Sequence, residues 1–374
     1  MRILQLIDVY KTGGAEKVFD SFSKFCKLHG YLSDSYSIYK SEHSRYLNFL
    51  IENNASSLIK KTKQQIQATL MLERILHTYK YDRVVSFLDR SNLIGILACK
   101  KCRIPITVTI HNPPTIQYRK LGIMKYIVFM LLRYFYNFSY VKVIAVSKQV
   151  RDSLLSIGVH KATIIYNPIE IERRKLQTHF NEYGYFLAVG RLDYQKGFWK
   201  LIKAVGILKN EYHKNPKLII LGEGEQKDKL ENLIKSMELE SNIKLLGYIK
   251  NPLPIINNAK CIVFSSFYEG FPIVVLEGYL LKKAVIGTLI SVPEEIRNVF
   301  ESNDFFYTNK YTSEDFSPLN ISQDEMKLAE ILNKAMEKEV ALIKMSQDGY
   351  DWVKKNCNIN NFYGYLNMSI HNEQ

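Results

Sequence analysis

Two glutamates in the second half of the chain are spaced so that both could contact one ligand. Glu269 and Glu277 are separated by seven residues, in a stretch that reads Tyr-Glu-Gly-Phe-Pro-Ile-Val-Val-Leu-Glu-Gly. Gly270 and Pro272 are expected to end a loop and begin a helix, because proline is favoured in the first helical turn. Glu269 then lies at the start of the helix and Glu277 about two turns further along. Since carboxylates accept hydrogen bonds from hydroxyl groups, one could hold a hexose and the other a ribose.

Two cations occur upstream of these glutamates. Arg191 and Lys196 lie five positions apart in Gly-Arg-Leu-Asp-Tyr-Gln-Lys-Gly, directly after an apolar run at 185–189 that predicts a strand. Arginine presents a planar fork to phosphate oxygens, and lysine supplies a mobile point charge. Both would stabilise the negative charge that develops on a departing diphosphate. The alternative is a pair of surface cations beside a turn.

The first half of the chain offers two weaker signals. Gly13 and Gly14 follow the first expected strand and open a helix, so their backbone N–H groups could approach an anion. Their spacing matches neither the dinucleotide-binding fingerprint nor the P-loop, and the alternative is a tight turn. His111 follows another expected strand, where an imidazole is commonly structural.

The elements that must position these residues repeat a simple pattern. Short apolar runs alternate with longer helical stretches in the first half, and the same pattern restarts near residue 185. This alternation predicts an α/β protein with two doubly wound, Rossmann-like domains whose parallel sheets are covered by helices. We expect an N-terminal domain over 1–168, a polar linker over 169–183, a C-terminal domain over 184–345, and a helix within 346–374 that crosses back to the first domain.

The excess positive charge belongs to the first half. Residues 1–170 hold 25 Lys and Arg against 11 Asp and Glu, which leaves 26 of each for the remaining residues, from the chain totals of 51 and 37. Such a surface attracts polyanions or anionic lipid head groups, although a lysine-rich composition is the simpler explanation. The segment Tyr118–Tyr140 is apolar, aromatic and edged with cations. It is interpreted either as an interfacial helix or as a buried core helix.

The five cysteines, an odd number, do not form a disulfide framework. Together with a first segment that lacks the features of a secretory signal, they predict a cytoplasmic protein. Cys99 and Cys102 have no second pair or histidine set to complete a zinc site, so no metal site is expected.

Taken together, these motifs resemble glycosyltransferase family 4, also called glycosyl transferases group 1, and its members that assemble bacterial polysaccharides. The resemblance runs across nearly the whole chain and is most specific in the second half. It rests on the following set: Gly13-Gly14, His111-Asn112, Ser147, Asn167-Pro168, Gly190-Arg191, Lys196-Gly197, Gly222-Glu223-Gly224, Glu269-Gly270-Phe271-Pro272 and Glu277.

The resemblance implies a GT-B fold, in which the two domains face each other across a cleft, and a donor that is a nucleotide diphosphate sugar. It implies that Arg191 and Lys196 bind the donor diphosphate and that Glu277 binds the ribose. It implies that Glu269, with Gly270 and Phe271 after it, lies near the donor sugar. The loop at Gly13 and Gly14 joins this donor set by the same resemblance, and His111 would face the sugar from the other domain.

For activity, the resemblance implies retaining transfer of a hexose or N-acetylhexosamine, with no metal and no cofactor. A UDP-sugar is the favoured donor, and a lipid-linked saccharide is the expected acceptor, as in O-antigen, capsule or lipopolysaccharide assembly. We therefore expect a cytoplasmic protein bound peripherally to the inner membrane through its basic N-terminal half and Tyr118–Tyr140, without a nucleic-acid partner.

Two other functions stay open at this point. Nucleotide-sugar epimerases and phosphorylases share the same scaffold, and a fold does not fix a reaction. A non-catalytic polyanion or membrane binder would account for the net charge of +14 alone. The neutral second half, with its set of donor residues, favours transfer over either alternative.

Overall fold

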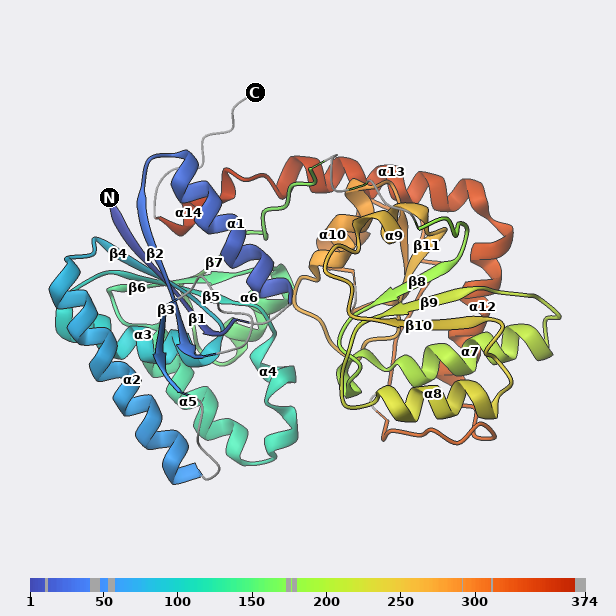
Figure 1. Ribbon diagram of the computed structural model, residues 1–374, viewed down its shortest axis with the longest axis horizontal. Helices are drawn as coiled ribbons and strands as arrows, with labels where there is room; N and C mark the ends of the chain where they lie inside the picture. Colours follow the sequence, from blue (N-terminus) through green and yellow to red (C-terminus); the bar gives the residue numbers. More distant parts are fainter. Residues whose placement is uncertain are drawn as a thin grey trace. The chain divides into compact units, whose positions relative to one another are not determined.

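The computed structural model describes residues 1–10, 13–40, 48–52, 58–172, 176, 180–290, 292–310 and 312–366. The chain forms two compact units, shown in Figure 1. Unit 1 joins Met1–Ile169 to the segment that begins at Cys357, and unit 2 is Glu170–Asn356. The linker that we expected over 169–183 is thus assigned to unit 2 from Glu170 on, although 173–175 and 177–179 lie outside the described residues. Asn258 of unit 2 donates a hydrogen bond of 3.0 Å to the carbonyl of Phe180.

Unit 1 is built on a parallel sheet. Its strands, among the described residues, lie in the order β3-β2-β1-β4-β5-β6-β7, and every pairing is parallel. The strands are β1 (Arg2–Val9), β2 (Leu32–Tyr39), β3 (Asn48–Ile51), β4 (Arg83–Phe87), β5 (Ile106–Ile110), β6 (Val141–Ala145) and β7 (Ala162–Ile164). The helices are α1 (Gly14–Leu28), α2 (Leu58–Tyr79), α3 (Asp89–Cys102), α4 (Pro114–Gln117), η1 (Arg119–Leu121), α5 (Met124–Tyr136), α6 (Lys148–Ser156) and α14 (Asn361–Tyr365).

Unit 2 repeats this architecture. Its strand order is β10-β9-β8-β11-β12-β13, again parallel throughout the described residues. The strands are β8 (Phe186–Val189), β9 (Leu218–Leu221), β10 (Ile243–Gly247), β11 (Cys261–Phe264), β12 (Ala284–Thr288) and β13 (Phe306–Tyr307). The helical elements are η3 (Tyr194–Lys196), α7 (Phe198–Asn210), α8 (Lys227–Ser236), α9 (Leu253–Asn258), α10 (Ile273–Leu280), α11 (Glu294–Arg297), α12 (Gln323–Glu337) and α13 (Glu339–Asn356).

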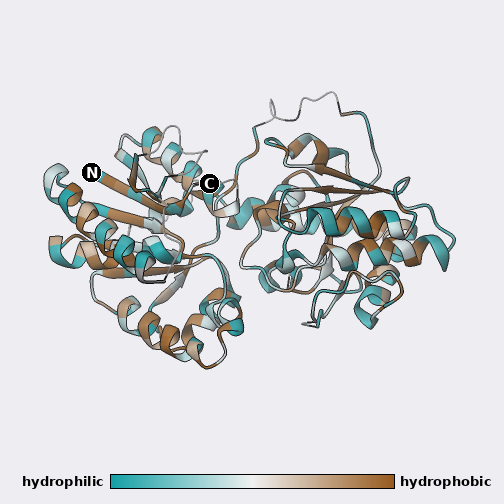
Figure 2. Cartoon of the chain, turned by 60° about the horizontal axis from the view of Figure 1, so that its bottom comes forward, coloured by the Kyte–Doolittle hydropathy of each residue, from teal (hydrophilic) through white to brown (hydrophobic). Residues whose placement is uncertain are grey.

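Both sheets form the cores of their units. Figure 2 shows the strands mostly in the hydrophobic colour, whereas the helices carry both colours. The sequence of β9 is Leu-Ile-Ile-Leu, and all four residues are buried. Strands covered on both faces need such continuous apolar runs, which explains why the apolar runs of the sequence predicted these strands.

The strand order reverses direction once in each sheet, between β1 and β4 in unit 1 and between β8 and β11 in unit 2. Loops that leave neighbouring strands on opposite sides at such a point open a crevice at the carboxyl edge of the sheet, where doubly wound proteins bind ligands. The expected alternation of strands and helices is therefore confirmed. A ligand site is expected at the carboxyl edge of each sheet, where the strand order reverses.

A segment from the far end of the sequence completes the core of unit 1. Phe362 and Tyr365 of α14 are fully buried, and the ring of Phe362 lies 5.2 Å from Phe22 and 5.5 Å from Phe25 of α1. Thr107 of β5 donates a 2.8 Å hydrogen bond to the carbonyl of Tyr365. Within the expected segment 346–374, residues up to Asn356 extend α13 in unit 2, and α14 belongs to unit 1.

The aromatic segment Tyr118–Tyr140 folds as η1, α5 and short connections. Within α5, Tyr136 is the buried residue. The apolar side chains of this segment that are more than a third exposed are Leu121, Ile123, Met124, Tyr126, Ile127, Met130, Leu131 and Tyr134. The buried core-helix alternative is therefore wrong for α5. Across the described ranges, no helix combines the length and the apolar character needed to cross a bilayer.

Candidate active site

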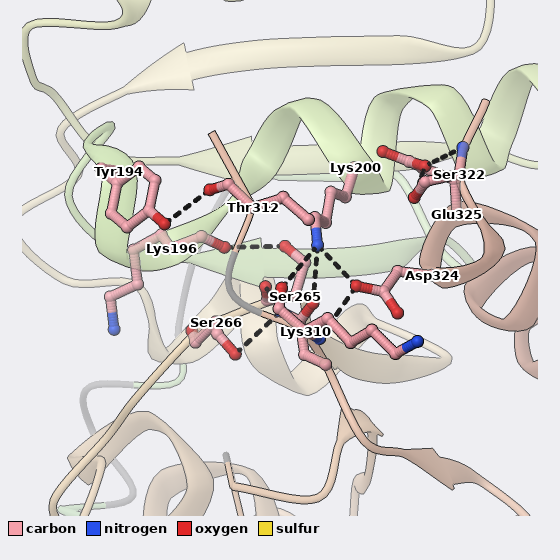
Figure 3. Close-up of polar contacts among 11 residues, drawn as sticks. Tyr194, Lys196, Lys200, Ser265, Ser266, Lys310, Thr312, Ser322, Asp324 and Glu325 are labelled. Carbon is pink, nitrogen blue, oxygen red and sulfur yellow. Dashed lines mark hydrogen bonds and ion pairs between the residues drawn. The ribbon is translucent and has the colours of Figure 1, made fainter. Parts of the chain in front are cut away.

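The loops that follow β8 and β11 are joined at the carboxyl edge of the unit 2 sheet. The amide of Phe267 donates to the carbonyl of Gln195 at 2.8 Å, and Nε2 of Gln195 donates to the carbonyl of Tyr268 at 2.9 Å. The rings of Tyr194 and Phe267 stack with their centroids 4.7 Å apart. Oγ of Ser265 donates to the carbonyl of Lys196 at 2.8 Å, as Figure 3 shows. The two loops therefore form one continuous surface.

This joined surface brings together two of the residues that we expected in the donor site. Nζ of Lys196 lies 2.6 Å from Oε1 of Glu269, and the two side chains are 14% and 7% exposed. An ammonium group has three donors, of which this bond takes one. The Lys196 ammonium is therefore largely desolvated and fixed in position, which suits it to bind an incoming anion.

Arg191 lies apart from this pair. Its side chain is 71% exposed, and its guanidinium is 3.1 Å from the carboxylate of Asp193 on the same loop. A longer contact of 3.4 Å joins it to Oε1 of Gln195. The expectation that Arg191 and Lys196 straddle one diphosphate stays a prediction, and it requires the Arg191 side chain to exchange these partners for phosphate oxygens.

Glu277 lies on α10, which begins at Ile273 after Pro272 as its N-terminal cap. Glu277 is thus about one helical turn from the start of α10, rather than the two turns expected from Glu269. Taken as whole residues, both glutamates are buried. Gly270 is buried in the turn between Glu269 and α10. Phe271 is 5% exposed, with its ring 6.4 Å from that of Trp352 on α13, so this side chain fixes the turn to the core of unit 2.

Close backbone contact forms the floor of the site. The loop after β9 lies so near the loop after β8 that a Cβ on Gly222 would stand 1.8 Å from the carbonyl oxygen of Gly190. Gly222 also has a φ of +145°, which side chains rarely adopt. Gly190 itself leaves room for Lys196, since a Cβ there would lie 2.8 Å from Cε of that lysine. Gly190 thus leaves the space that the Lys196 side chain occupies, and Gly222 allows the two loops to lie this close.

In unit 1, the glycine pair lies at a helix start as expected. Gly13 is the extended N-terminal cap of α1, and Gly14 is its first residue. A Cβ on Gly13 would lie 2.6 Å from Oε2 of Glu16, so a carboxylate of the protein itself folds over this helix start. Lys11 and Thr12, the residues before the pair, lie outside the described residues.

His111 is held at the end of β5. Its Nε2 is 2.9 Å from Oγ1 of Thr109, and that hydroxyl donates its own hydrogen to the carbonyl of Ser86 at 3.0 Å. Nε2 must therefore carry the proton and donate, which leaves Nδ1 as the acceptor. Burial lowers the pKa of His111 to about 4, so the imidazole is neutral near pH 7.

Two acidic residues of unit 1, Asp8 and Asp89, were not identified as candidate site residues from the sequence. Oδ1 of Asp8, at the end of β1, accepts hydrogen bonds from the amide and the hydroxyl of Ser91 at 2.6 and 2.8 Å. Burial raises the pKa of Asp8 to about 6. Asp89 accepts a 2.7 Å bond from the hydroxyl of Tyr118. The signal was an acidic residue at a predicted strand end, a place where ligands bind in doubly wound folds.

Leu88, between β4 and α3, has φ +78° and ψ +162°, a conformation that is otherwise confined to glycine. It lies beside Asp89 at the point where the strand order of unit 1 reverses. Among the described residues, no cluster of three or more His, Cys, Asp or Glu side chains is arranged to hold a metal ion.

Two family models match the chain. Residues 170–348 match the model described as glycosyl transferases group 1, and residues 42–173 match the model described as glycosyltransferase family 4. An uncharacterised glycosyltransferase of Methanocaldococcus jannaschii is 28% identical over 73% of this chain and 76% of its own length. A 4-alpha-N-acetylgalactosaminyltransferase of Campylobacter jejuni, named for an acceptor linked to diphospho-undecaprenol, is 31% identical over 59% of this chain and 60% of its own length.

Solved structures have the same fold. Anabaena HepE in complex with UDP-glucose superposes with a TM-score of 0.75 at 16% identity, covering 98% of each chain. WaaG, a glycosyltransferase involved in lipopolysaccharide biosynthesis, superposes with a TM-score of 0.71 at 13% identity, covering 98% of this chain and 99% of its own. At these identities the likeness shows the fold alone, which is the GT-B fold of two Rossmann-like domains.

Proposed function

Because this chain belongs to the glycosyl transferases group 1 family, we propose that it is a retaining transferase that uses a nucleotide diphosphate sugar, with UDP favoured. It transfers a hexose or N-acetylhexosamine to a lipid-linked saccharide. The observation that carries the proposal is the 2.6 Å contact between Lys196 and Glu269 at the switch point of the unit 2 sheet. The Campylobacter relatives, named for undecaprenol-linked acceptors, and the UDP-glucose complex of HepE support the choice of acceptor and donor.

In this proposal the protein's cations act on the leaving group. As the bond to the anomeric carbon breaks, negative charge grows on the diphosphate, and Lys196 stabilises it from its fixed position beside Glu269. Arg191 turns from Asp193 to the same phosphates. Glu269 accepts hydrogen bonds from sugar hydroxyls, and Glu277 from the ribose. A reaction without metal or cofactor, and with retention, remains an expectation from the family.

The epimerase alternative is not proposed, because the relatives cited above are named as glycosyltransferases. The non-catalytic binder is set aside for the same reason. Nothing in the chain's own chemistry favours either one over transfer.

Transfer is tested with UDP-linked hexoses and N-acetylhexosamines and an undecaprenyl-diphosphate-linked disaccharide, with product detected by mass spectrometry. Replacing Lys196 by methionine should lower kcat by about a hundredfold, the scale of losing one positioned charge donor. Glu269→Gln should also lower kcat. Lys227→Met, a change at a 43% exposed lysine of α8, is the control and should leave kcat within about twofold. Full activity of Lys196→Met would refute the assignment of the site.

We further propose that the exposed face of α5 contacts an anionic bilayer, where a lipid-linked acceptor would be found. Ile127, Met130 and Leu131 on this face are 47%, 62% and 46% exposed. The partner is identified by charge complementarity, since the net positive charge resides in residues 1–170, and Lys125 and Arg133 lie on the same helix. Apolar side chains flanked by cations suit the head-group region of a membrane.

The bilayer contact is tested by flotation with vesicles of phosphatidylcholine, with and without about a third phosphatidylglycerol, a composition that sets the surface charge. Changing Ile127, Met130 and Leu131 together to serine should reduce the bound fraction at least about fivefold. The matched control changes Leu319, Val340 and Ile343 of unit 2, which are also exposed, and should bind as the wild type does. A dimer in sedimentation that only the α5 variant abolishes would instead identify a second copy as the occupant.

A further inference from the structure

Two lysine side chains of α7 are almost completely buried. Lys200 and Lys203 lie on the first two turns of α7, with side chains 1% and 0% exposed. Lysine is among the residues least often buried, and a cation near a helix N-terminus opposes the helix dipole. A buried ion pair is weak evidence for stability, because desolvation offsets much of the attraction.

The ammonium of Lys200 is bound on three sides. Nζ donates to Oδ1 of Asn309 at 2.7 Å and to Oδ2 of Asp324 at 2.8 Å, and it reaches the carbonyl of Lys310 at 3.4 Å. Figure 3 shows these contacts converging on one nitrogen. Asp324 also accepts the amide of Lys310 at 3.0 Å. The cation thus ties α7, α12 and the loop after β13 to a single point.

Asn309 connects Lys200 to the loop after β11. Because its Oδ1 accepts from Lys200, its Nδ2 must face the other way, where it donates to the carbonyls of Ser265 and Ser266 at 3.0 and 3.4 Å. Nζ of Lys200 also lies 4.7 Å from the ring centroid of Phe267, within the range of a cation–π contact. Three consecutive residues of the loop are therefore contacted, Ser265 and Ser266 by the Asn309 amide and Phe267 by the Lys200 cation.

The loop after β11 carries Glu269 and contacts Lys196 of the loop after β8. Ser265, whose carbonyl accepts from Asn309, donates through Oγ to the carbonyl of Lys196. Glu269 ends the loop and makes the ion pair with Nζ of Lys196. A continuous chain of polar contacts thus leads from Lys200 through Asn309 and Ser265 to Lys196.

Lys203 provides the contrast. Its Nζ donates to the carbonyl of Asn320 at 2.7 Å and lies 3.6 Å from Asp315, both in the segment that leads to α12. It is as deeply buried as Lys200 and lies on the same helix, yet the contacts described for it lead away from the loop after β11.

We propose that Lys200, Asp324 and Asn309 are positioning residues for the loop 265–269. Through this loop they hold the side chains of Lys196 and Glu269 in the positions that transfer requires. This inference rests on the proposed function. A displacement of about 1 Å at a positioned charge is enough to slow a reaction strongly. The loss should fall on kcat more than on the KM for the donor, because the charge on the diphosphate grows in the transition state.

The decisive variant is Asn309→Asp. It keeps an oxygen for Lys200 and removes the donor to Ser265 and Ser266, so the ion pair with Asp324 survives while the contact to the loop is lost. A second variant, Lys200→Met with Asp324→Asn, removes both charges together and avoids leaving a buried carboxylate unpaired. Lys203→Met is the matched control for loss of a buried lysine from α7.

Two measurements are made on the full chain. Hydrogen exchange of the ligand-free protein should show the peptide 265–271 exchanging at least about tenfold faster in Asn309→Asp, because the loop is no longer held where the amide of Phe267 donates to the carbonyl of Gln195. Lys203→Met should leave that peptide unchanged. With UDP-sugar and the disaccharide acceptor, Asn309→Asp should lower kcat about tenfold or more, with KM within about threefold, whereas Lys203→Met retains kcat within about twofold.

The outcomes separate the two proposals. If wild-type protein transfers no sugar from any UDP donor, the proposed function fails, and hydrogen exchange still decides whether Asn309 orders the loop. If Asn309→Asp leaves both the exchange of 265–271 and kcat unchanged, the positioning role is refuted. It is equally refuted if Lys203→Met produces the same changes in exchange and in kcat.

Discussion

Asp8 and His111 lie at the carboxyl edge of one sheet, and their pKa values are displaced in opposite directions by the same cause. Burial disfavours the charged form of each group, so it raises the pKa of Asp8 to about 6 and lowers that of His111 to about 4. Both side chains are therefore neutral over a range in which the unfolded chain would carry charges on both.

The two groups should oppose each other in the pH dependence of stability. Between the ordinary value of 3.8 and about 6, folded Asp8 binds more protons than the unfolded chain, so its contribution falls as pH rises. Between about 4 and 6.5, folded His111 binds fewer protons, so its contribution rises with pH. Each change amounts to about 3 kcal/mol at 1.36 kcal/mol per pKa unit, and the two largely cancel.

Asp8→Asn should remove this cancellation. We expect the unfolding midpoint of unit 1 in this variant to rise more steeply between pH 4.5 and 6.5 than in the wild type, because the His111 contribution is then unopposed. Urea unfolding at several pH values measures the effect. Asp152→Asn, a change at a 49% exposed carboxylate, is the control. Parallel curves for Asp8→Asn and the wild type would contradict the assignment.

At the residue scale, the sequence predicted where candidate residues lie along the strands better than it predicted which side chains contact each other. Residue identity and strand-end placement were enough to nominate Lys196, Glu269 and His111. The contact between Lys196 and Glu269, residues 73 positions apart in the chain, depends on two loops meeting at the sheet edge. The spacing of residues within one segment does not show which distant loop that segment will contact. The same limit hid Asn309, which has no local motif and acts through its amide geometry.

At the element scale, the turn after β9 depends on the absence of a side chain. Gly222→Ala would place a methyl group 1.8 Å from the carbonyl oxygen of Gly190, so one loop must move away from the other. We expect the unfolding free energy of unit 2 to fall by about 3 kcal/mol or more, beyond the cost of a positive φ alone. Stabilisation by UDP in a thermal shift should also be lost.

Gly184→Ala provides the comparison for this change. Gly184 also has a positive φ, of +73°, but no atom lies within 4 Å of the position that its Cβ would take. Its substitution should cost only the backbone strain of about 1 kcal/mol, and it should leave the UDP shift intact. Equal losses for the two variants would show that strain, rather than the contact between loops, controls Gly222.

The sequence predicted some elements far better than others, for a physical reason. The apolar runs Cys261–Phe264 and Ile106–Ile110 coincide with the bounds of β11 and β5, because strands covered on both faces are mostly apolar along their whole length. No such apolar run marks β2, because its face toward α1 is polar. Nε2 of Gln5, which has two hydrogens to donate, lies there 2.6 to 3.0 Å from the hydroxyl oxygens of Ser23, Ser33 and Ser35. A strand whose buried face makes polar contacts has no alternating hydrophobic pattern from which it could be predicted.

At the scale of the whole molecule, unit 1 depends on residues that follow unit 2 in the chain. Phe362→Ala would leave a cavity among Phe22, Phe25 and Tyr365, and we expect it to cost about 3 to 5 kcal/mol in unit 1. Hydrogen exchange should quicken in β1 and β4. Leu332→Ala, at a fully buried position of α12, should instead quicken exchange within unit 2. Undisturbed exchange in β1 and β4 of Phe362→Ala would show that α14 is dispensable.

The placement of α14 also sets the order in which a nascent chain can finish folding. A ribosome completes the strands of unit 1 first, and at about 5 to 20 residues per second it needs roughly 10 to 40 s more to reach Phe362. All of Glu170–Asn356 emerges during that interval. The unit that is made first is therefore the last to close its core, and the apolar side chains of α1 that await α14 are exposed to chaperones throughout synthesis.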